Sequence, residues 1–362
     1  MKDSEFIKLF LGSYCVLSLL FPLHATCQEI YYESTSGINR GLLSESYWRS
    51  RSLQGSSANV LGYSDIKLGA TAKIGNIEFV VEREEVAILS SNENSLFAAV
   101  TSKQAFNNSS TGIYPLTAKV NSYEYDALGI MLRNSTESND INLVLIPKLL
   151  SLNSFKAGTG FGQLEVGTTS QRLTGSLSRQ GLSSYGFLTN PNNLQIGTGG
   201  TLDAKLSYEL KQNKFEIAIQ NLMSKIPVNG YFNSDRSYQV TTQNGGLIFS
   251  TVPSLTGNYG QLNKSLKLPK ILKTSWTSQP AQSNWAEKLG VISFEDGKII
   301  WGEVDYKYGN SSIQVKTYEL QNIFLTLVMN NLILNNLSLE VTVGSAFHAK
   351  NQLLITGLHY SF

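Results

Sequence analysis

The stretch TLDAKLSYELKQNKFEIAIQNL, residues 201–222, decides the fold. Apolar and polar residues alternate along it, so that Leu206 and Tyr208 fall on one face while Lys205 and Glu209 fall on the other. The alternation resumes after a turn near Gln212-Asn213. A period of two on both arms predicts an antiparallel hairpin with one apolar face and one charged face.

The same pattern recurs along the chain, in IKLGATAKIGNIEFVVER at 66–83, in GVISFEDGKIIWGEVDYKY at 290–308 and in NNLSLEVTVG at 335–344. Asp296-Gly297 is a strong hairpin dipeptide, because both central residues of its turn take positive φ. We count about sixteen candidate strands, and fourteen remain possible. We find no convincing capped helix after the N-terminal segment.

The composition sets this chain apart from ordinary soluble domains. Charged residues make up 15% of the 362, against about a quarter in a typical globular protein, while hydrophobic residues make up 41%. The net charge is +2, and the 29 Lys and Arg residues are spread without a basic stripe. Nucleic acid is therefore not an expected partner.

The N-terminus reads as a secretory signal peptide. Lys2 and Lys8 precede an apolar stretch over 10–23, and cleavage after the small residues Ala25 and Cys27 would leave Gln28 first. A membrane anchor and a lipid-modified Cys27 are the alternatives. Because both cysteines lie within 1–27, the mature chain would contain neither a disulfide nor a thiolate zinc site.

Alternating strands in an exported chain of low charge predict an all-β fold, a transmembrane antiparallel up-and-down β-barrel of about 14–16 strands. We expect three regions, a signal peptide at 1–27, a periplasmic lead-in or lumen plug at 28–60 and the barrel at 61–362. A secreted β-sandwich or β-helix is the soluble alternative.

Loop lengths then predict the topology. Segments 104–116, 180–201, 225–237 and 278–286 are expected outside the cell, and the short links 169–170, 212–213 and 296–297 are expected on the periplasmic side.

The chain ends in LLITGLHYSF, with Leu358, Tyr360 and Phe362 on one face of a predicted strand. This ending resembles the C-terminal assembly signal of Gram-negative outer-membrane β-barrel proteins, although Thr356 departs from its apolar pattern. The resemblance implies an outer-membrane location and recognition by the barrel-assembly machinery. It covers about ten residues and indicates a class, not a specific family.

Charges on the inward faces of the clearest hairpins are the candidate lumen-lining residues. They carry both signs and either sort solutes by charge or pair with one another to brace the wall. The candidates are Asp203, Lys205, Glu209, Lys211, Glu216, Glu303, Asp305 and Lys307. Glu82, Arg83, Glu84 and Glu85 form a further cluster, which we expect to be solvated in the lumen or at its rim.

No catalytic residue, metal ligand or cofactor is expected. The glycine-rich stretches at 158–163 and 197–200 lack a Walker lysine and a following helix. His359 and Ser361 share one face, but polar lining at a strand end explains them better than a hydrolase site.

The sequence thus favours a porin-like channel or transporter that passes small solutes across the outer membrane without catalysis. A plugged barrel for apolar molecules, and an adhesin, interaction barrel or secreted β protein acting through exposed loops, remain as alternatives. Outer-membrane lipid, the assembly machinery and small solutes are the expected partners, with homo-oligomerisation possible.

Overall fold

The computed structural model describes most of the chain after the N-terminal segment. The described residues are 26–39, 59–74, 77–95, 110–133, 140–166, 173–183, 197–228, 231–243, 246–252, 258–260, 264–309, 311–318, 322–330, 337–344 and 352–361. None of their helices is long and apolar enough to cross a membrane.

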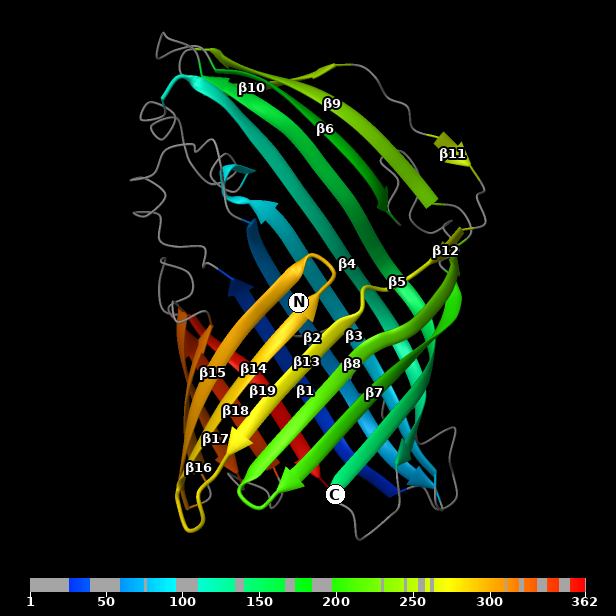
Figure 1. Cartoon of the computed structure of the whole chain (residues 1–362). Helices are drawn as coiled ribbons and strands as arrows, with labels where there is room; N and C mark the ends of the chain where they lie inside the picture. Colours follow the sequence, from blue (N-terminus) through cyan, green and yellow to red (C-terminus); the bar gives the residue numbers. More distant parts are fainter. Residues whose placement is uncertain are drawn as a thin grey trace.

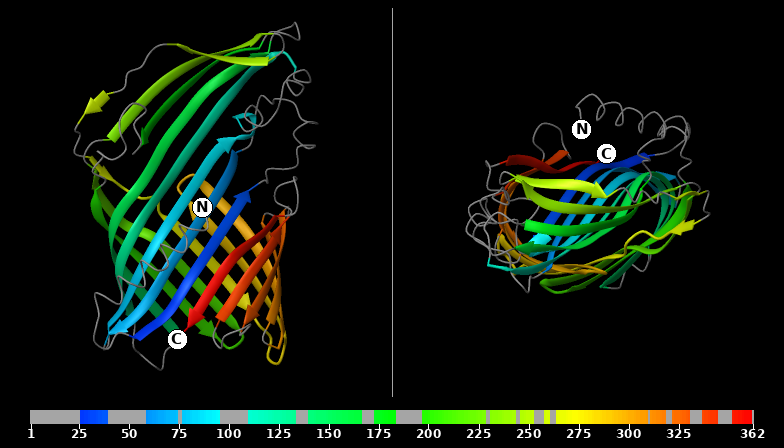
Figure 2. Two further views of the ribbon diagram at one scale, coloured as in Figure 1. Left: turned by 180° about the vertical axis from the view of Figure 1, so that it is seen from behind. Right: turned by 90° about the horizontal axis from the view of Figure 1, so that it is seen from above.

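Antiparallel pairings join the main strands into a ring (Figure 1). In ring order the strands are β1 (Thr26–Asn39), β2 (Asn59–Ile74), β3 (Ile77–Asn92), β4 (Gly112–Arg133), β5 (Ile141–Val166), β7 (Thr198–Leu210), β8 (Asn213–Val228), β13 (Ile271–Ser278), β14 (Trp285–Phe294), β15 (Gly297–Tyr308), β16 (Ser311–Tyr318), β17 (Asn322–Asn330), β18 (Leu337–Gly344) and β19 (Gln352–Ser361). Because β19 pairs with β1, the fourteen strands return to their start, as a barrel requires. Viewed along its axis the ring is oval (Figure 2).

Five further strands stand outside the ring, which explains why it has fourteen strands and not sixteen. They are β6 (Leu173–Ser183), β9 (Tyr231–Gln243), β10 (Gly246–Val252), β11 (Asn258–Gly260) and β12 (Lys264–Leu266). The far half of β5 pairs with β6, and β6 pairs with β9, so these strands continue the sheet beyond the barrel. The expected up-and-down order is therefore interrupted between β5 and β7 and between β8 and β13. Strands β6, β10 and β11 pair with β9 away from the ring, and β12 pairs only with the end of β8.

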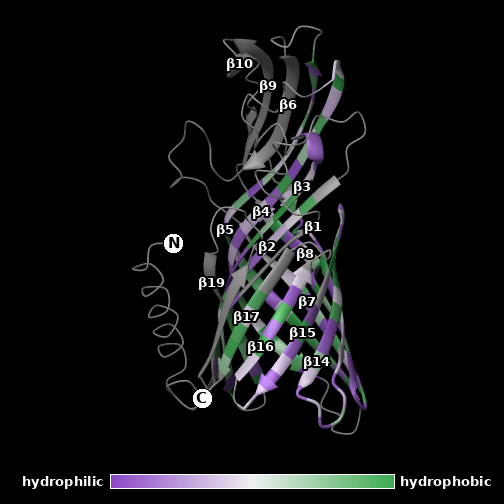
Figure 3. Ribbon diagram, turned by 90° about the vertical axis from the view of Figure 1, so that its left-hand side faces the viewer, coloured by the Kyte–Doolittle hydropathy of each residue, from purple (hydrophilic) through white to green (hydrophobic). Residues whose placement is uncertain are grey.

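A lipid-facing band covers the outside of the ring. Strand β15 exposes Ile300 and Val304 outward, while its alternate residues Glu303 and Asp305 are buried within the ring. Apolar and polar residues alternate in this way along the lower strands of Figure 3. A polar interior and an apolar exterior reverse the pattern of a soluble protein, as a membrane barrel requires.

Aromatic side chains mark one edge of the band. Tyr208 lies opposite Phe215 between β7 and β8, and Phe215 lies opposite Trp276 on β13. Further round the ring, the rings of Trp285 and Tyr306 are 4.5 Å apart. All five residues lie toward the end that holds the turn at 211–212, so they form an interfacial girdle at this end.

The strands on one side of the barrel are much longer than a membrane crossing needs. A tilted strand spans the bilayer with about nine to eleven residues, and β4 and β5 have 22 and 26. On the outer face of β4, exposed Leu128 is followed toward the far end by Asp126 and Glu124, which pair with Arg83 of β3. The apolar band therefore ends near 126–128, and the strands continue beyond it.

Within the expected lead-in or plug at 28–60, residues 28–39 instead belong to strand β1. Residues Thr26–Asn39 form a wall strand that pairs with β19 on one side and β2 on the other. The stretch contains many polar residues, such as Gln28, Glu29 and Glu33. These residues hide its alternation in the sequence and make a wall strand resemble a polar lead-in. Residues 40–58, and 1–25 of the expected signal peptide, lie outside the described part of the chain.

The observed topology also differs in part from the predicted one. The backbone N–H of Gln279 donates to the carbonyl of Gln212 at 2.9 Å, so the connection 279–284 lies at the same end as the turn 211–212. The turn at 295–296 then lies at the opposite end, because β14 runs between them. The prediction placed 278–286 outside the cell and 296–297 on the periplasmic side. It was wrong on both because it counted as barrel crossings strands that stand outside the ring. The link 169–170 lies outside the described residues.

Candidate functional site

A cavity of about 770 Å³ occupies the lumen near the girdle end. Its lining reaches the ends of strands at that rim, with Arg133 of β4, Lys214 of β8 and Thr277 of β13. Deeper in the barrel it is bounded by Lys148 and Gln220. The cavity is therefore a vestibule that extends from the girdle end toward the middle of the barrel.

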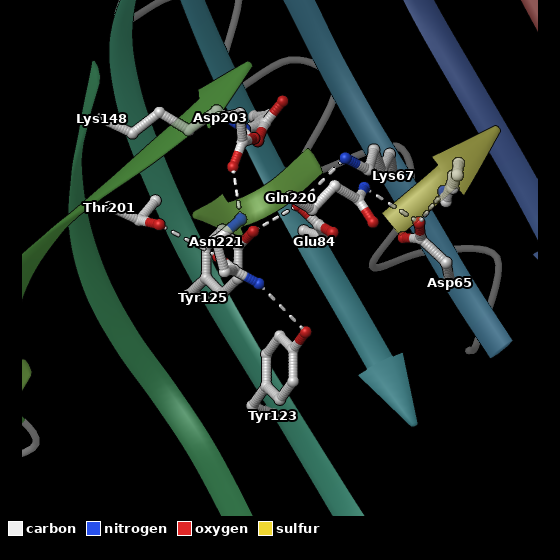
Figure 4. A network of polar contacts seen from close by, with 12 residues as sticks. Asp65, Lys67, Glu84, Tyr123, Tyr125, Lys148, Thr201, Asp203, Gln220 and Asn221 are labelled. Carbon is white, nitrogen blue, oxygen red and sulfur yellow. Dashed lines mark hydrogen bonds and ion pairs between the residues drawn. The ribbon is translucent and has the colours of Figure 1, made fainter. Parts of the chain in front are cut away.

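A network of buried polar side chains lies at the deep end of the vestibule (Figure 4). Asp65 of β2 accepts a hydrogen bond from Gln220 of β8 at 3.3 Å and forms an ion pair with Lys273 of β13 at 3.0 Å. Strand β2 is next to neither β8 nor β13 in the ring, so these contacts cross the lumen. Two opposite walls are thus joined by side chains.

Two lysines complete this polar layer. Lys67 lies 3.2 Å from Glu84 on the neighbouring strand, and Tyr125 also donates a hydrogen bond to Glu84. Lys148 of β5 pairs with Glu82 and, at 2.6 Å, with Asp203 of β7. The layer is consequently an ionic network with few water-exposed atoms.

A bulge in β8 brings an amide into the same layer. Between Leu202 and Ala204 the register with β8 jumps from Met223 to Ile219, so β8 carries extra residues there. Asn221, with φ of 56°, sits in this bulge and is 1% exposed. Its side-chain amide accepts a hydrogen bond from Thr201 and donates to the hydroxyl of Tyr123 on the facing wall at 3.3 Å.

An apolar layer lies against the polar one on the side away from the vestibule. The rings of Tyr63 on β2 and Phe294 on β14 are 5.0 Å apart, again across the lumen. The buried members of this cluster come from both walls: Leu61, Tyr63, Val86, Ile88, Tyr123, Tyr125, Ala127, Leu150, Leu152, Phe155, Ile226, Leu268, Ile271, Ile292 and Ile299. We call the polar and apolar layers together the septum. Its described side chains belong to wall strands and to the segment 267–270.

The structure divides the predicted lumen residues into three groups. Asp203, Lys205, Glu216 and Glu303 line the vestibule. Asp305 is buried in the wall, with one carboxylate oxygen that accepts no hydrogen bond among the described residues. Glu209, Lys211 and Lys307 are exposed at the girdle end and do not line the vestibule.

The cluster at 82–85 is not solvated as a unit. Its residues alternate, so Glu82 and Glu84 point into the septum while Arg83 and Glu85 face outward. Sequence reasoning also missed Asp65, because the septum depends on which distant strands face one another. The two adjacent polar residues Gln220-Asn221, which break the alternation of β8, are a signal that could have located the bulge.

The C-terminal assembly signal is described only in part. Leu358 and Tyr360 belong to β19 and pair with Tyr32 and Ile30 of β1 in the strand that completes the ring. Phe362 lies outside the described residues. The predicted role of these three residues in assembly stays a prediction.

Comparisons with known proteins identify no family. No family model matches the chain, and no curated protein does. One similar solved structure is described as the TodX monoaromatic hydrocarbon channel deltaS2 mutant, with 9% identity, a TM-score of 0.38, and coverage of 94% of this chain and 89% of that one. A second is Pseudomonas aeruginosa OccK9 (OpdG), with 10% identity, a TM-score of 0.16, and coverage of 93% and 97%. The barrel architecture follows from the strand pairings of the chain itself.

Proposed function

We propose that this chain is a gated transport barrel of the Gram-negative outer membrane, which passes small polar solutes and carries out no chemistry of its own. The observation that carries the proposal is the charged vestibule that ends at a septum of side chains from opposite walls. The signal peptide, the assembly signal and insertion by the barrel-assembly machinery are parts of the same proposal.

The septum is suited to act as a gate because side-chain contacts hold it. The contact between Tyr63 and Phe294 joins two walls without a covalent link, and rotation of either ring would part it. Apolar constrictions close pores to ions and polar solutes by excluding water. In this proposal the septum is the closed gate of a passage, and the vestibule is its solute-accessible half.

The vestibule favours a polar solute over an apolar one. Its lining includes Asn142, Ser207 and Ser275 together with charged side chains from both walls. An apolar solute would leave these groups without water, which costs about 1–3 kcal/mol for each one that loses its partner. The alternative of a barrel for apolar molecules is accordingly less well supported.

Planar-bilayer recording of the mature chain from Gln28 tests the gate. Wild-type protein is expected to show brief, infrequent openings, and Tyr63→Ala/Phe294→Ala is expected to show long-lived openings, because the variant removes the ring contact across the lumen. Leu325→Ala on the lipid-facing side of β17 is the matched control and is expected to resemble wild type.

Two outcomes would count against the proposal. Membrane insertion of both proteins without current in either would mean that the barrel is no channel. A steady wild-type conductance equal to that of the double variant would mean that the septum is not a gate.

A second function is favoured by the sheet that extends beyond the apolar band. Strands β4, β5, β6 and β9 continue together past the membrane-facing region and present a broad surface (Figure 1). A passive channel has no need of such a structure. Binding of a macromolecule at this extension is therefore the alternative, and it predicts insertion without conductance.

A further inference from the structure

The vestibule carries an excess of positive charge on one side, and this inference rests on the proposed transport function. Among the described residues that line it, the arc from β7 to β16 holds Lys205, Lys214, Lys273, Lys288 and Lys316 against Asp203, Glu216 and Glu303. The wall from β1 to β5 is balanced, with Lys67, Arg133 and Lys148 against Glu29, Glu33 and Glu82. The excess of two positive charges therefore belongs to the arc.

Two of these lysines share one carboxylate. Glu303 of β15 lies 2.7 Å from the ammonium of Lys288 and 3.8 Å from that of Lys316. The Glu303 side chain is 7% exposed, and the two lysine side chains are 30% and 27% exposed. The acid therefore lies within the wall beneath the lysines, and the ammonium groups are what a solute in the vestibule meets.

The same arrangement occurs nearer the rim. Glu216 lies 3.0 Å from Lys205 and 3.3 Å from Lys214, and both lysines are more exposed than the acid between them. Lys273 repeats it at the septum, where its partner Asp65 is almost fully buried. Carboxylates that are less exposed than their lysine partners thus hold a row of ammonium groups in place along the arc, from the rim to the septum.

An aromatic ring and aliphatic side chains interrupt this charged lining. The ammonium of Lys316 lies 4.6 Å from the centre of the Trp301 ring, and Trp301 also lines the vestibule. Val144, Ile146 and Ile292 contribute further apolar surface. A solute that fits both features carries negative charge and a short carbon skeleton.

We propose that the vestibule is a binding site for small organic anions with two carboxylate or phosphate groups. The spacing of the lysines over several strands offers ammonium donors to both ends of such a solute, and each charged contact is among the stronger hydrogen bonds that a protein forms. The row of lysines that ends at Lys273 would deliver the anion to the septum.

Calorimetric titration of the refolded mature chain in detergent tests the site without requiring conduction. Succinate is the probe, with succinamide as its neutral analogue, putrescine as a cation and inorganic phosphate as an anion without a carbon skeleton. Lys205→Gln/Lys288→Gln is expected to weaken succinate binding by about tenfold or more, because it removes two of the charges that meet the solute. Lys211→Gln/Lys298→Gln removes two exposed charges outside the vestibule and is expected to stay within about twofold of wild type.

Several results would overturn the assignment. They are absence of succinate binding to wild type, equal binding of succinamide or putrescine, equal weakening by the control variant, and phosphate binding as tight as that of succinate. Circular dichroism checks the fold of each variant, and the single Lys205→Gln, at a side chain that is 53% exposed, provides a smaller effect in a minimally altered barrel. Succinate binding by a protein that shows no current, in the wild type or in Tyr63→Ala/Phe294→Ala, would contradict the proposed channel and leave the binding site standing.

Discussion

Lys67 and Glu84 form an ion pair at the septum, in which the carboxylate of Glu84 is shielded from water. The Glu84 residue is 0% exposed, and one of its oxygens accepts no hydrogen bond among the described residues. Removing one partner of a buried pair costs about 3–5 kcal/mol, because the other charge stays buried without compensation. The septum is therefore sensitive to single charge changes that a solvated lumen would tolerate.

We predict that Glu84→Gln lowers the free energy of unfolding by about 3 kcal/mol, and that adding Lys67→Met restores most of the loss. Urea unfolding of the barrel in lipid vesicles measures both. Glu209→Gln, which disrupts an exposed pair with Lys214 at 3.7 Å, is the control and should change stability by less than about 1 kcal/mol. A Glu84→Gln loss as small as that of the control would show that water reaches the septum.

A glycine determines where Trp301 lies in the vestibule. A Cβ added at Gly290 would come within 2.4 Å of the indole ring, so the two residues approach more closely than any side chain at 290 allows. Gly290→Ala is predicted to displace the ring and to destabilise the barrel by about 1–3 kcal/mol.

Tryptophan fluorescence with Trp301→Phe as the reference reports the displacement. Gly302→Ala serves as the control, because a Cβ there meets its nearest atom, in Leu289, at 3.4 Å. An unchanged spectrum in Gly290→Ala would mean that the backbone of β14 adjusts instead of the ring.

At the scale of the element, the bulge in β8 is the least regular part of the wall. Asn221 adopts a left-handed backbone conformation there, and its backbone N–H donates to a carboxylate oxygen of Asp203 at 2.8 Å. A residue other than glycine or asparagine pays about 1–2 kcal/mol in this conformation. The bulge is therefore held by backbone preference and by the polar layer together.

We predict that Asn221→Ala destabilises the barrel by about 2–4 kcal/mol and that Asn221→Gly costs about 1 kcal/mol less, because glycine accepts the backbone conformation but also loses the side-chain hydrogen bonds. Thermal unfolding in detergent compares them. Gln282→Ala, at a left-handed position in an exposed turn, isolates the backbone contribution. Equal losses at positions 221 and 282 would show that the septum contacts of Asn221 add nothing.

The strands themselves could be predicted from alternation, because a lipid-facing and a lumen-facing side chain must follow one another along each crossing. The hairpin at 201–222 was predicted correctly, and its turn differs by one residue. The bulge and the departure of β6 and β9 from the ring were not predictable in this way, since both depend on which strand the backbone pairs with and not on the side-chain pattern.

At the scale of the whole molecule, the ring shows why the vestibule could be predicted only in part. Inward charges such as Lys205 and Glu216 follow from local alternation. The septum contacts between Asp65 and Lys273 join residues 208 positions apart, and they exist because the ring is oval enough for opposite walls to touch. No local pattern encodes that approach.

The apolar band gives a prediction for the barrel as a membrane protein. Ile300 lies on the outer face of β15, well away from the girdle residue Tyr306, and Phe161 lies on β5 beyond the charged residues that end the band. Both are large apolar side chains that are exposed to a similar degree, at 44% and 48%. They differ chiefly in their position relative to the bilayer, so they can be compared as a pair.

Ile300→Arg is predicted to cost about 2–4 kcal/mol of stability in lipid vesicles, because the arginine would face hydrocarbon near the midplane. Phe161→Arg is predicted to cost less than about 1 kcal/mol, because the same charge there meets water. Urea unfolding of both variants in vesicles and in detergent separates the two cases, since the lipid cost at Ile300 weakens where detergent can adapt around the charge. Equal losses at the two positions would mean that β5 does not extend beyond the membrane, and the long sheet would then have to be placed within the bilayer.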